Sequence, residues 1–237
     1  MTRSRIACRA VFLDAGGVIV LPDRHLLAGA LAEIGIDIDP DAVPSAHYRA
    51  VRHLDRAPSY PAALFPELGV APRRTVEALA VWTRLDNRDT AGKVLWSEPT
   101  PSALETIAAL RRRGLAVVIV TNSDGHAEEN LAACGFAGVP VIDSEVVGAA
   151  KPDPRIFEAA LALAGGRAGG GDRVGPGIRA TEVVHVGDTP STDIAGARAA
   201  GITPIHFDPL RACRARDHRH VATLAGIWQH LSGPGRS

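Results

Sequence analysis

The hydrophobic positions of the chain form two patterns that alternate along most of its length. Short apolar runs without polar alternation are typical of strands covered on both faces of a parallel sheet. We expect five such strands, at residues 11–13, 115–120, 139–142, 182–186 and 202–207. Apolar residues at helical spacing predict helices at 102–113, 128–134, 153–164, 191–200 and 221–231. This alternation predicts an α/β fold with a doubly wound parallel sheet.

The segment 21–99 departs from this alternation, because its apolar residues recur every three or four positions throughout. We expect helices at 26–34, 41–56 and 75–85. A loop is expected around Pro58, Pro61 and Pro66, and no run in the segment is typical of a strand. We therefore expect two domains, an α/β core formed by residues 1–20 and 100–237 and an all-helical insertion formed by residues 21–99.

Two local signals refine these elements. Ser102 precedes a predicted helix and Glu105 follows three residues later, which is the spacing of a capping box, and Gly114 is a natural C-cap of the same helix. Residues 165–177 include seven glycines but lack the residue order of a phosphate-binding loop. That composition predicts a linker.

Charge argues against a nucleic-acid partner. The chain has 26 basic and 26 acidic residues and a formal net charge of zero. Its densest basic stretch, residues 211–219, is interrupted by Cys213 and Asp217, so we expect a solvated turn there instead of a basic patch.

The cysteine pattern and the hydropathy of the chain indicate in which cellular compartment the protein is expected. Cys8, Cys134 and Cys213 are odd in number, far apart and without a CxxC pair, which favours a reducing environment. No apolar run approaches the roughly 18 residues of a membrane span, and residues 1–9 lack the apolar region of a secretory signal. We therefore expect a cytoplasmic protein without a membrane partner.

Polar side chains follow the expected strands where three of them end. A polar residue stands at the end of each of three expected buried strands, or within two residues of that end. These residues are Asp14, Thr121 and Asp188. Parallel strands place their carboxyl ends at one edge of the sheet, where such folds bind ligands. Lys151 precedes Pro152 and the start of a predicted helix, which points it to the same edge. Carboxylates bind Mg²⁺ while lysine and hydroxyl groups bind phosphate oxygens, so this set predicts a site for both.

Four stretches of the chain together resemble the motifs of the haloacid dehalogenase superfamily of hydrolases. The first two stretches are Leu13-Asp14-Ala15-Gly16-Gly17-Val18 and Val120-Thr121-Asn122-Ser123. The third is Lys151-Pro152-Asp153-Pro154-Arg155-Ile156-Phe157. The fourth is Val186-Gly187-Asp188-Thr189-Pro190-Ser191-Thr192-Asp193 together with Ala197-Arg198-Ala199-Ala200-Gly201. Their order and spacing extend the resemblance over nearly the whole chain. It implies a Rossmann-like core, and it makes the insertion at 21–99 similar to the smaller helical cap of this superfamily, which closes over the site.

The resemblance also implies roles for individual residues. Asp14 would be the nucleophile that forms an aspartyl-phosphate. The implied Mg²⁺ ligands are Asp14, Asp188 and the backbone carbonyl of Gly16. The implied phosphoryl ligands are Thr121, the Asn122 amide and Lys151. Asp193 would orient Lys151 or a metal-bound water. Mg²⁺ and lysine make such a reaction feasible, because they offset the repulsion between a carboxylate and an anionic phosphate.

One position departs from the superfamily pattern. Its phosphatases usually carry a second Asp two residues after the nucleophile, as general acid and base, and this chain has Gly16 there. The loss is compatible with a phosphatase whose leaving group needs little protonation, or whose acid is another residue such as His25 or Asp23. A non-catalytic metal-binding or regulatory protein is a second interpretation. A 2-haloacid dehalogenase is a third, although Tyr is absent at position 16 and the Asp188 and Asp193 pair favours a metal. A phosphonate-cleaving enzyme needs a cap lysine, for which only Lys93 is available.

The sequence therefore favours a Mg²⁺-dependent phosphomonoester hydrolase that acts on a small phosphorylated metabolite, with sugar phosphates preferred. Polar residues of the insertion that could reach such a substrate are His47, Tyr48, Arg49, Arg52 and His53. Side chains on helices of this kind more often face solvent.

Overall fold

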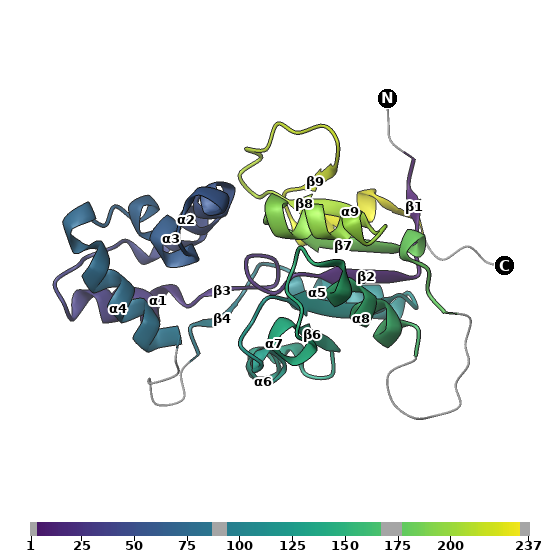
Figure 1. Ribbon diagram of the computed structural model, residues 1–237, viewed down its shortest axis with the longest axis horizontal. Coiled ribbons are helices and arrows are strands. Elements are labelled where there is room, and N and C mark those ends of the chain that lie inside the picture. The colour runs from purple at the N-terminus through teal and green to yellow at the C-terminus, as the bar shows by residue number, and fades with distance from the viewer. Residues whose placement is uncertain (1–3, 87–93, 167–176, 233–237) are drawn as a thin grey trace. The chain divides into compact units, whose positions relative to one another are not determined.

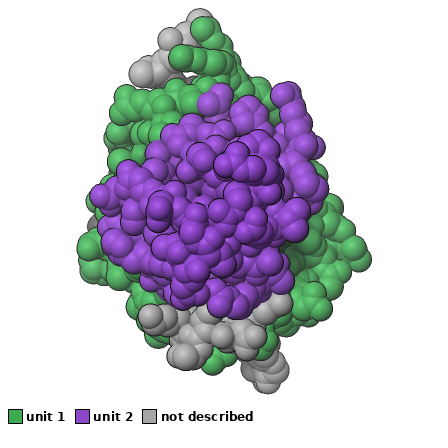
Figure 2. Space-filling view, turned by 90° about the vertical axis from the view of Figure 1, so that its left-hand side faces the viewer, with its two compact units in different colours: residues 1–19, 99–237 green, residues 20–98 purple. Residues whose placement is uncertain are grey.

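The computed structural model describes residues 4–86, 94–166 and 177–232. It divides into two compact units, one formed by Met1–Ile19 with Pro99–Ser237 and the other by Val20–Glu98 (Figure 2). Lys93 and most of the predicted glycine-rich linker, residues 167–176, lie outside the described residues. No helix within the described ranges is long and apolar enough to cross a membrane.

The first unit contains a six-stranded sheet whose strands follow the order β6-β5-β2-β7-β8-β9. The strands are β2 (Ala10–Leu13), β5 (Ala116–Thr121), β6 (Val141–Asp143), β7 (Val183–Gly187), β8 (Thr203–Phe207) and β9 (Arg219–Val221). Every pairing in this sheet is parallel, and Leu13 of β2 lies opposite both Ile119 and Val186. The predicted α/β fold with a parallel sheet is confirmed.

Helices flank this sheet (Figure 1). They are α5 (Ala103–Arg112), α6 (Ala127–Leu131), α7 (Ser144–Val147), α8 (Pro154–Ala164) and α9 (Ala195–Ala199). Ile156 and Phe157 of α8 are fully buried in one apolar cluster with Phe12 of β2 and Val118 of β5. Burial of side chains of this size stabilises each by roughly 1.5–3 kcal/mol, so α8 is held firmly against the centre of the sheet.

The predicted capping box of α5 is wrong. Ser102 adopts a left-handed backbone conformation with φ of 61°, and its side chain makes no cap hydrogen bond. A Ser in that conformation cannot aim its hydroxyl at the first free N–H groups, which requires an extended backbone at the cap. Glu105 is exposed on the helix surface.

The predicted C-terminal helix at 221–231 is also wrong. The segment contains the end of β9, a 3₁₀ helix at Leu224–Gln229, and β10 (Leu231–Ser232), which pairs in parallel with β1 (Ile6–Ala7). Val221, Leu224 and Leu231 are buried at a spacing that suits a helix, yet Thr223 caps a new turn by accepting from the N–H of Gly226. Thr and Gly weaken a continuous helix, and the two ends of the segment pair with strands instead, Val221 with Phe207 of β8 and Leu231 with Ile6 of β1.

The described part of the second unit has four α-helices, α1 (Arg24–Ala32), α2 (Val43–Ala50), α3 (Tyr60–Glu67) and α4 (Thr75–Asp86). Two predictions fail here. The expected proline loop is α3, because Ser59 caps it, Pro61 lies in the first turn, and Pro66 lies in the last. The expected absence of strands is contradicted by a two-stranded sheet of β3 (Val20–Pro22) and β4 (Trp96–Pro99).

Aromatic rings hold the helices of this unit together. His47 of α2 is 2% exposed, and its Nδ1 lies 2.7 Å from the Tyr60 hydroxyl. The Tyr60 ring in turn packs against Trp82 and Trp96, at 5.3 Å between ring centroids in both cases. Arg49 forms an ion pair with Glu67 at 2.7 Å. His47 and Arg49, which the sequence offered as substrate contacts, therefore have structural partners within the unit.

Candidate active site

Three neighbouring strands deliver buried polar groups to one edge of the sheet. Asp14 follows β2 at the centre, Thr121 ends β5 on one side of it, and Asp188 follows β7 on the other. The three residues are only 8%, 5% and 2% exposed. The N–H of Asp14 donates to the carbonyl of Val186 at 2.9 Å, so the sheet pairing extends to the carboxylate-bearing residue itself.

Lys151 is brought to this edge by a clamp on its backbone. The Asn122 side chain donates from Nδ2 to the Lys151 carbonyl at 3.0 Å and accepts from the Lys151 N–H at 2.7 Å. Both ends of that amide are thus used to tie Lys151 to the residue after β5. The ammonium then lies 2.6 Å from Oδ1 of Asp14 and 2.8 Å from Oδ1 of Asp193.

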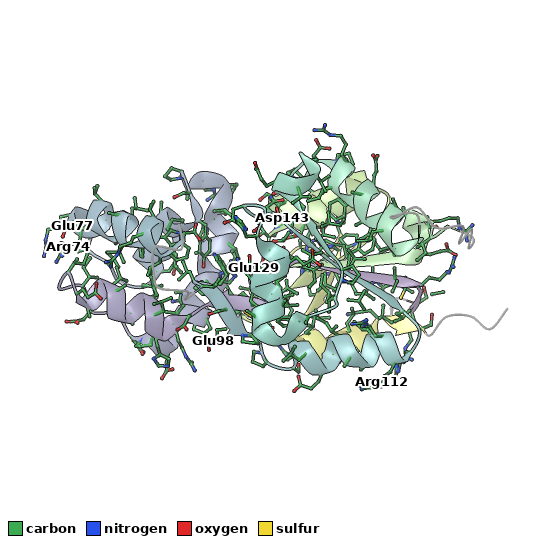
Figure 3. The ribbon with its side chains drawn as sticks, turned by 90° about the horizontal axis from the view of Figure 1, so that it is seen from below. Arg74, Glu77, Glu98, Arg112, Glu129 and Asp143 are labelled. Atoms are coloured by element: carbon green, nitrogen blue, oxygen red, sulfur yellow. The ribbon has the colours of Figure 1, made fainter. Side chains whose placement is uncertain are left out.

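The loop that carries Asn122 is itself anchored from β6. Asp143, labelled in Figure 3, ends β6 and accepts from the backbone N–H groups of Gly125 and Ala127. Ser144 adds two hydrogen bonds, because its hydroxyl accepts from the N–H of Ser123 and donates to the carbonyl of the same residue. These contacts fix the path of the chain directly after Thr121.

Asp193 is fully buried and receives several donors. Its Oδ1 accepts from the Lys151 ammonium and from Nε2 of His185, each at 2.8 Å. Its Oδ2 accepts from the N–H of Thr189 at 3.1 Å. A side chain at position 187 would overlap the Asp193 carboxylate, so only glycine leaves room for it there.

His185 belongs to the site but was missed by the sequence analysis. It lies in β7 and is 0% exposed. Burial lowers its pKa, and a neutral ring that donates through Nε2 to a carboxylate leaves Nδ1 unprotonated. The signal was present, because a histidine inside the apolar run Val183–Gly187 needs a buried polar partner.

The carboxylates compete for the charge of Lys151. Burial and the neighbouring Asp193 raise the pKa of Asp14 to about 8, although Lys151 acts in the opposite direction. Burial opposes ionisation of Lys151 too, yet Asp14 and Asp193 raise its pKa overall. The pKa of Asp193 is lowered despite its burial, because Lys151 and His185 stabilise its anion. The Lys151 ammonium thus helps to stabilise the anionic form of Asp193, but it does not fully offset the effects that disfavour the anionic form of Asp14.

This arrangement fits a divalent cation. Asp14, Asp188 and Asp193 each offer a carboxylate oxygen, and these atoms lie within 4.8 Å of one another. Carboxylate oxygens are the ligands that Mg²⁺ prefers. Both oxygens of Asp193 accept hydrogen bonds, Oδ1 from Lys151 and His185 and Oδ2 from the N–H of Thr189. The contacts of Asp14 with Lys151 and with the N–H of Ala15 are both made by Oδ1. Asp14 and Asp188 are therefore better placed than Asp193 to offer an oxygen to a cation.

The two alternative acids suggested by the sequence belong to the second unit. The carboxylate of Asp23 accepts from the N–H groups of His25 and Leu26 and so caps α1. His25 is exposed.

Comparison with known proteins gives a consistent family. Residues 8–201 match the model of the haloacid dehalogenase-like hydrolases. The chain is 36% identical over 121 residues to a phosphoserine phosphatase of Thermus thermophilus, covering 49% of this chain and 43% of that protein. It is 28% identical over 187 residues to a ribulose-1,5-bisphosphate 5-phosphatase of Halopiger xanaduensis, covering 75% of this chain and 72% of that protein. This chain spans less than half the length of the first curated relatives it matches, from 35% to 49% of each.

The fold is also found among solved structures. A magnesium-bound HAD-hydrolase of Bacillus subtilis superposes with a TM-score of 0.59 at 17% identity, over 97% of this chain and 100% of that one. An identity this low shows a shared fold.

The space beside Gly187 predicts a sharp effect of its replacement. Gly187→Ala should lower the free energy of unfolding by about 1–3 kcal/mol, because the new methyl group displaces the buried Asp193 carboxylate. Gly29→Ala is the matched control. Gly29 lies in α1 with open space around it, so this change should raise the free energy of unfolding by about 0.5–1 kcal/mol. Urea unfolding measures both, and equal effects of the two substitutions would contradict the packing of Asp193 against Gly187.

The raised pKa of Asp14 predicts a pH-dependent effect of Asp14→Asn. With divalent cations removed, the folded state keeps a proton on Asp14 up to about pH 8, while the unfolded state releases it near its ordinary pKa. The wild-type free energy of unfolding therefore gains an unfavourable contribution as pH rises through this window. Asn cannot ionise, so the stability difference, variant minus wild type, should rise by roughly 3–4 kcal/mol between about pH 5 and pH 8. Urea titrations at several pH values measure it, and a difference independent of pH would contradict the assigned shift.

Proposed function

Because the chain belongs to the haloacid dehalogenase-like hydrolases, we propose that it is a Mg²⁺-dependent phosphomonoesterase that acts on a small phosphorylated metabolite. One observation carries the proposal. Asp14 lies at the end of a central strand, 2.6 Å from a buried lysine and among further buried carboxylates. A carboxylate in this setting can act as a nucleophile toward an anionic phosphate, because the lysine offsets the repulsion.

The names of the relatives support a small phosphorylated substrate. Phosphoserine and ribulose-1,5-bisphosphate, which appear in two of those names, are both small phosphate esters, and the second is a sugar phosphate. We propose sugar phosphates as the preferred class for this chain.

The proposed reaction begins with attack by a carboxylate oxygen of Asp14 on phosphorus, in line with the leaving oxygen. A bond from Asp14 to phosphorus forms while the bond from phosphorus to the leaving oxygen breaks, which gives an aspartyl-phosphate. Water then attacks that phosphorus and releases inorganic phosphate, restoring the Asp14 carboxylate. Positioning and charge stabilisation account for most of the rate in such transfers.

Three groups are proposed to hold the phosphoryl oxygens. They are the Lys151 ammonium, the Thr121 hydroxyl and the Asn122 backbone N–H. The side-chain amide of Asn122 is committed to the Lys151 backbone, so it acts as a positioning group instead of a ligand. The Thr121 hydroxyl can donate from the end of β5, beside the strand that carries Asp14.

We propose Asp14, Asp188 and the backbone carbonyl of Gly16 as the Mg²⁺ ligands. Bound there, Mg²⁺ supplies positive charge that offsets the repulsion between the Asp14 carboxylate and the phosphate. The raised pKa of Asp14 supports this choice, since it reflects a need for more positive charge at that carboxylate. Asp193 is proposed to hold the Lys151 ammonium in place, and its 2.8 Å contact supports that role over the alternative of orienting water.

Gly16 shapes the proposed substrate preference. A residue without a side chain cannot protonate a leaving oxygen, and general acid catalysis is typically worth about 10²–10⁴ in rate. The rate lost through the missing acid should be smallest for substrates whose leaving group is already stabilised, such as anomeric sugar phosphates. We further propose that the helical unit, residues 20–98, is the cap of the enzyme.

The first test measures phosphate release from sugar phosphates, nucleotides and p-nitrophenyl phosphate, in metal-free buffer and after addition of Mg²⁺. Mg²⁺-dependent release is expected from the wild type, and Asp14→Asn and Asp188→Asn should each lower kcat by at least about 10³-fold. Glu105→Gln is the matched carboxylate-to-amide control, because Glu105 is exposed on α5, and it should keep wild-type activity. Full activity in Asp14→Asn would overturn the proposed nucleophile, and release from no substrate by folded protein would overturn the activity.

The second test restores the missing acid. The backbone permits Gly16→Asp, because the left-handed conformation occurs at Gly17 and not at Gly16. If leaving-group protonation limits the rate, Gly16→Asp should raise kcat on alkyl phosphates by about 10²-fold and leave p-nitrophenyl phosphate within a few fold, since p-nitrophenolate needs no proton. An equal change on both substrates would count against the proposed role of position 16.

A further inference from the structure

A second cluster of metal-binding side chains lies where β8 passes to β9. His206 is in β8, Cys213 and His218 are in the connecting loop, and His220 is in β9. Each offers one ligand atom, and the four atoms lie within 4.8 Å of one another. Residues 211–219 are expected from the sequence to form a solvated turn, but His218 is only 7% exposed and Cys213 is half-buried.

Hydrogen bonds set the protonation of two of these rings. Nε2 of His206 lies 3.0 Å from the backbone carbonyl of Asp188, and a carbonyl only accepts, so Nε2 carries the proton. Nδ1 of His218 lies 2.7 Å from the Asp217 carboxylate and donates to it for the same reason. The remaining nitrogens, Nδ1 of His206 and Nε2 of His218, face each other at 3.4 Å. When both rings are neutral, these two nitrogens carry lone pairs that face each other, and a metal ion bound between them would remove that repulsion.

The two remaining members converge on the same point. Sγ of Cys213 lies 3.8 Å from Nε2 of His218, and the His220 ring centroid is 4.5 Å from that of His218. Nε2 of His220 is buried and has no hydrogen-bond partner among the described residues. A buried polar nitrogen left unpaired is costly and calls for an explanation.

The loop is shaped to present Cys213. The Asp208 carboxylate, directly after β8, accepts from the N–H of Ala212 at 3.1 Å and from the N–H of Cys213 at 2.8 Å. These bonds turn the chain back toward β8, so that a thiol seven residues beyond His206 returns to it.

From these contacts we propose that His206, Cys213, His218 and His220 form a closed, four-coordinate Zn²⁺ site. Zinc accepts imidazole nitrogen and thiolate sulfur in tetrahedral geometry, in which neighbouring ligand atoms are about 3.3–3.6 Å apart. The distance from Nδ1 of His206 to Nε2 of His218, 3.4 Å, and that from Sγ of Cys213 to Nε2 of His218, 3.8 Å, are already close to these ligand–ligand distances. Nitrogen and sulfur donors disfavour Mg²⁺, so this site and the carboxylate site select different metals.

The groups outside the four ligands suit a structural metal. Zinc-bound histidines usually donate their other nitrogen to a carboxylate or a carbonyl, as His218 does to Asp217 and His206 to Asp188. Asp217 is held in turn by Arg198 at 2.7 Å. The zinc would therefore fix the conformation of the β8–β9 loop and, through His206, the backbone of Asp188.

The test uses Co²⁺ as a spectroscopic substitute for Zn²⁺. The full chain is stripped of metal with a chelator, dialysed and kept in excess Mg²⁺ so that the carboxylate site is filled. One equivalent of Co²⁺ should give the intense visible bands of tetrahedral cobalt and a near-ultraviolet sulfur-to-cobalt band, and both should disappear when Zn²⁺ is added. Cys213→Ser should lose the sulfur band, and Asp217→Asn should weaken binding by about 10–100-fold. Cys134→Ser is the matched control, being a half-buried free cysteine on another element, and should keep the full spectrum.

A second measurement does not depend on the folding of any variant. In the wild type, Zn²⁺ should protect Cys213 from alkylation, read by mass spectrometry of its peptide, while Cys134 in the same sample reacts equally with and without the metal. A Co²⁺ spectrum without a sulfur band, or no saturable binding and no protection of Cys213, would overturn the proposal and leave a hydrogen-bonded histidine cluster only.

Discussion

The candidate active site depends on one buried ammonium shared by two buried carboxylates. Lys151 lies 2.6 Å from Asp14 and 2.8 Å from Asp193, and its side chain is 2% exposed. Removing these charges from water costs several kcal/mol per ion, so each must be held by its partners. Many local features serve this purpose. Asn122 clamps the Lys151 backbone, and Gly187 leaves room for Asp193. Gly196 lets α9 approach Pro152 beside the lysine.

Sequence patterns predicted the strand-end groups well, because parallel strands in one sheet must end at one edge. Asp14, Thr121 and Asp188 could be placed from the apolar runs before them, without knowledge of any long-range contact. Features that depend on side-chain packing were less accessible. His185 was missed because its role depends on a hydrogen bond to Asp193, eight residues away in the sequence. The predicted cap at Ser102 is wrong because the Ser102 backbone is left-handed. The strand pairing of β1 with β10 could not be inferred from helical spacing near the C-terminus.

Family membership identifies the class of hydrolase, whereas individual residues of this chain bear on its substrate. The match over residues 8–201 establishes a haloacid dehalogenase-like hydrolase, while the proposed substrate preference rests on particular positions of this chain. Gly16 is the most telling of these. A backbone carbonyl can bind a cation whatever its side chain, so metal binding and leaving-group protonation are separable properties here. In the proposed enzyme, loss of the second would leave the first intact and would favour substrates with good leaving groups.

The burial of Lys151 also has a practical consequence for labelling experiments. The chain has only two lysines, Lys93 and Lys151, since its other basic residues are arginines. Acylating reagents require an accessible, unprotonated amine, and Lys151 is enclosed and held in its charged form by Asp14 and Asp193. Acylation at this one position therefore becomes an intrinsic reporter of exposure. Any event that uncovers the ammonium, from local opening to loss of a carboxylate partner, adds a single mass increment to one identifiable peptide.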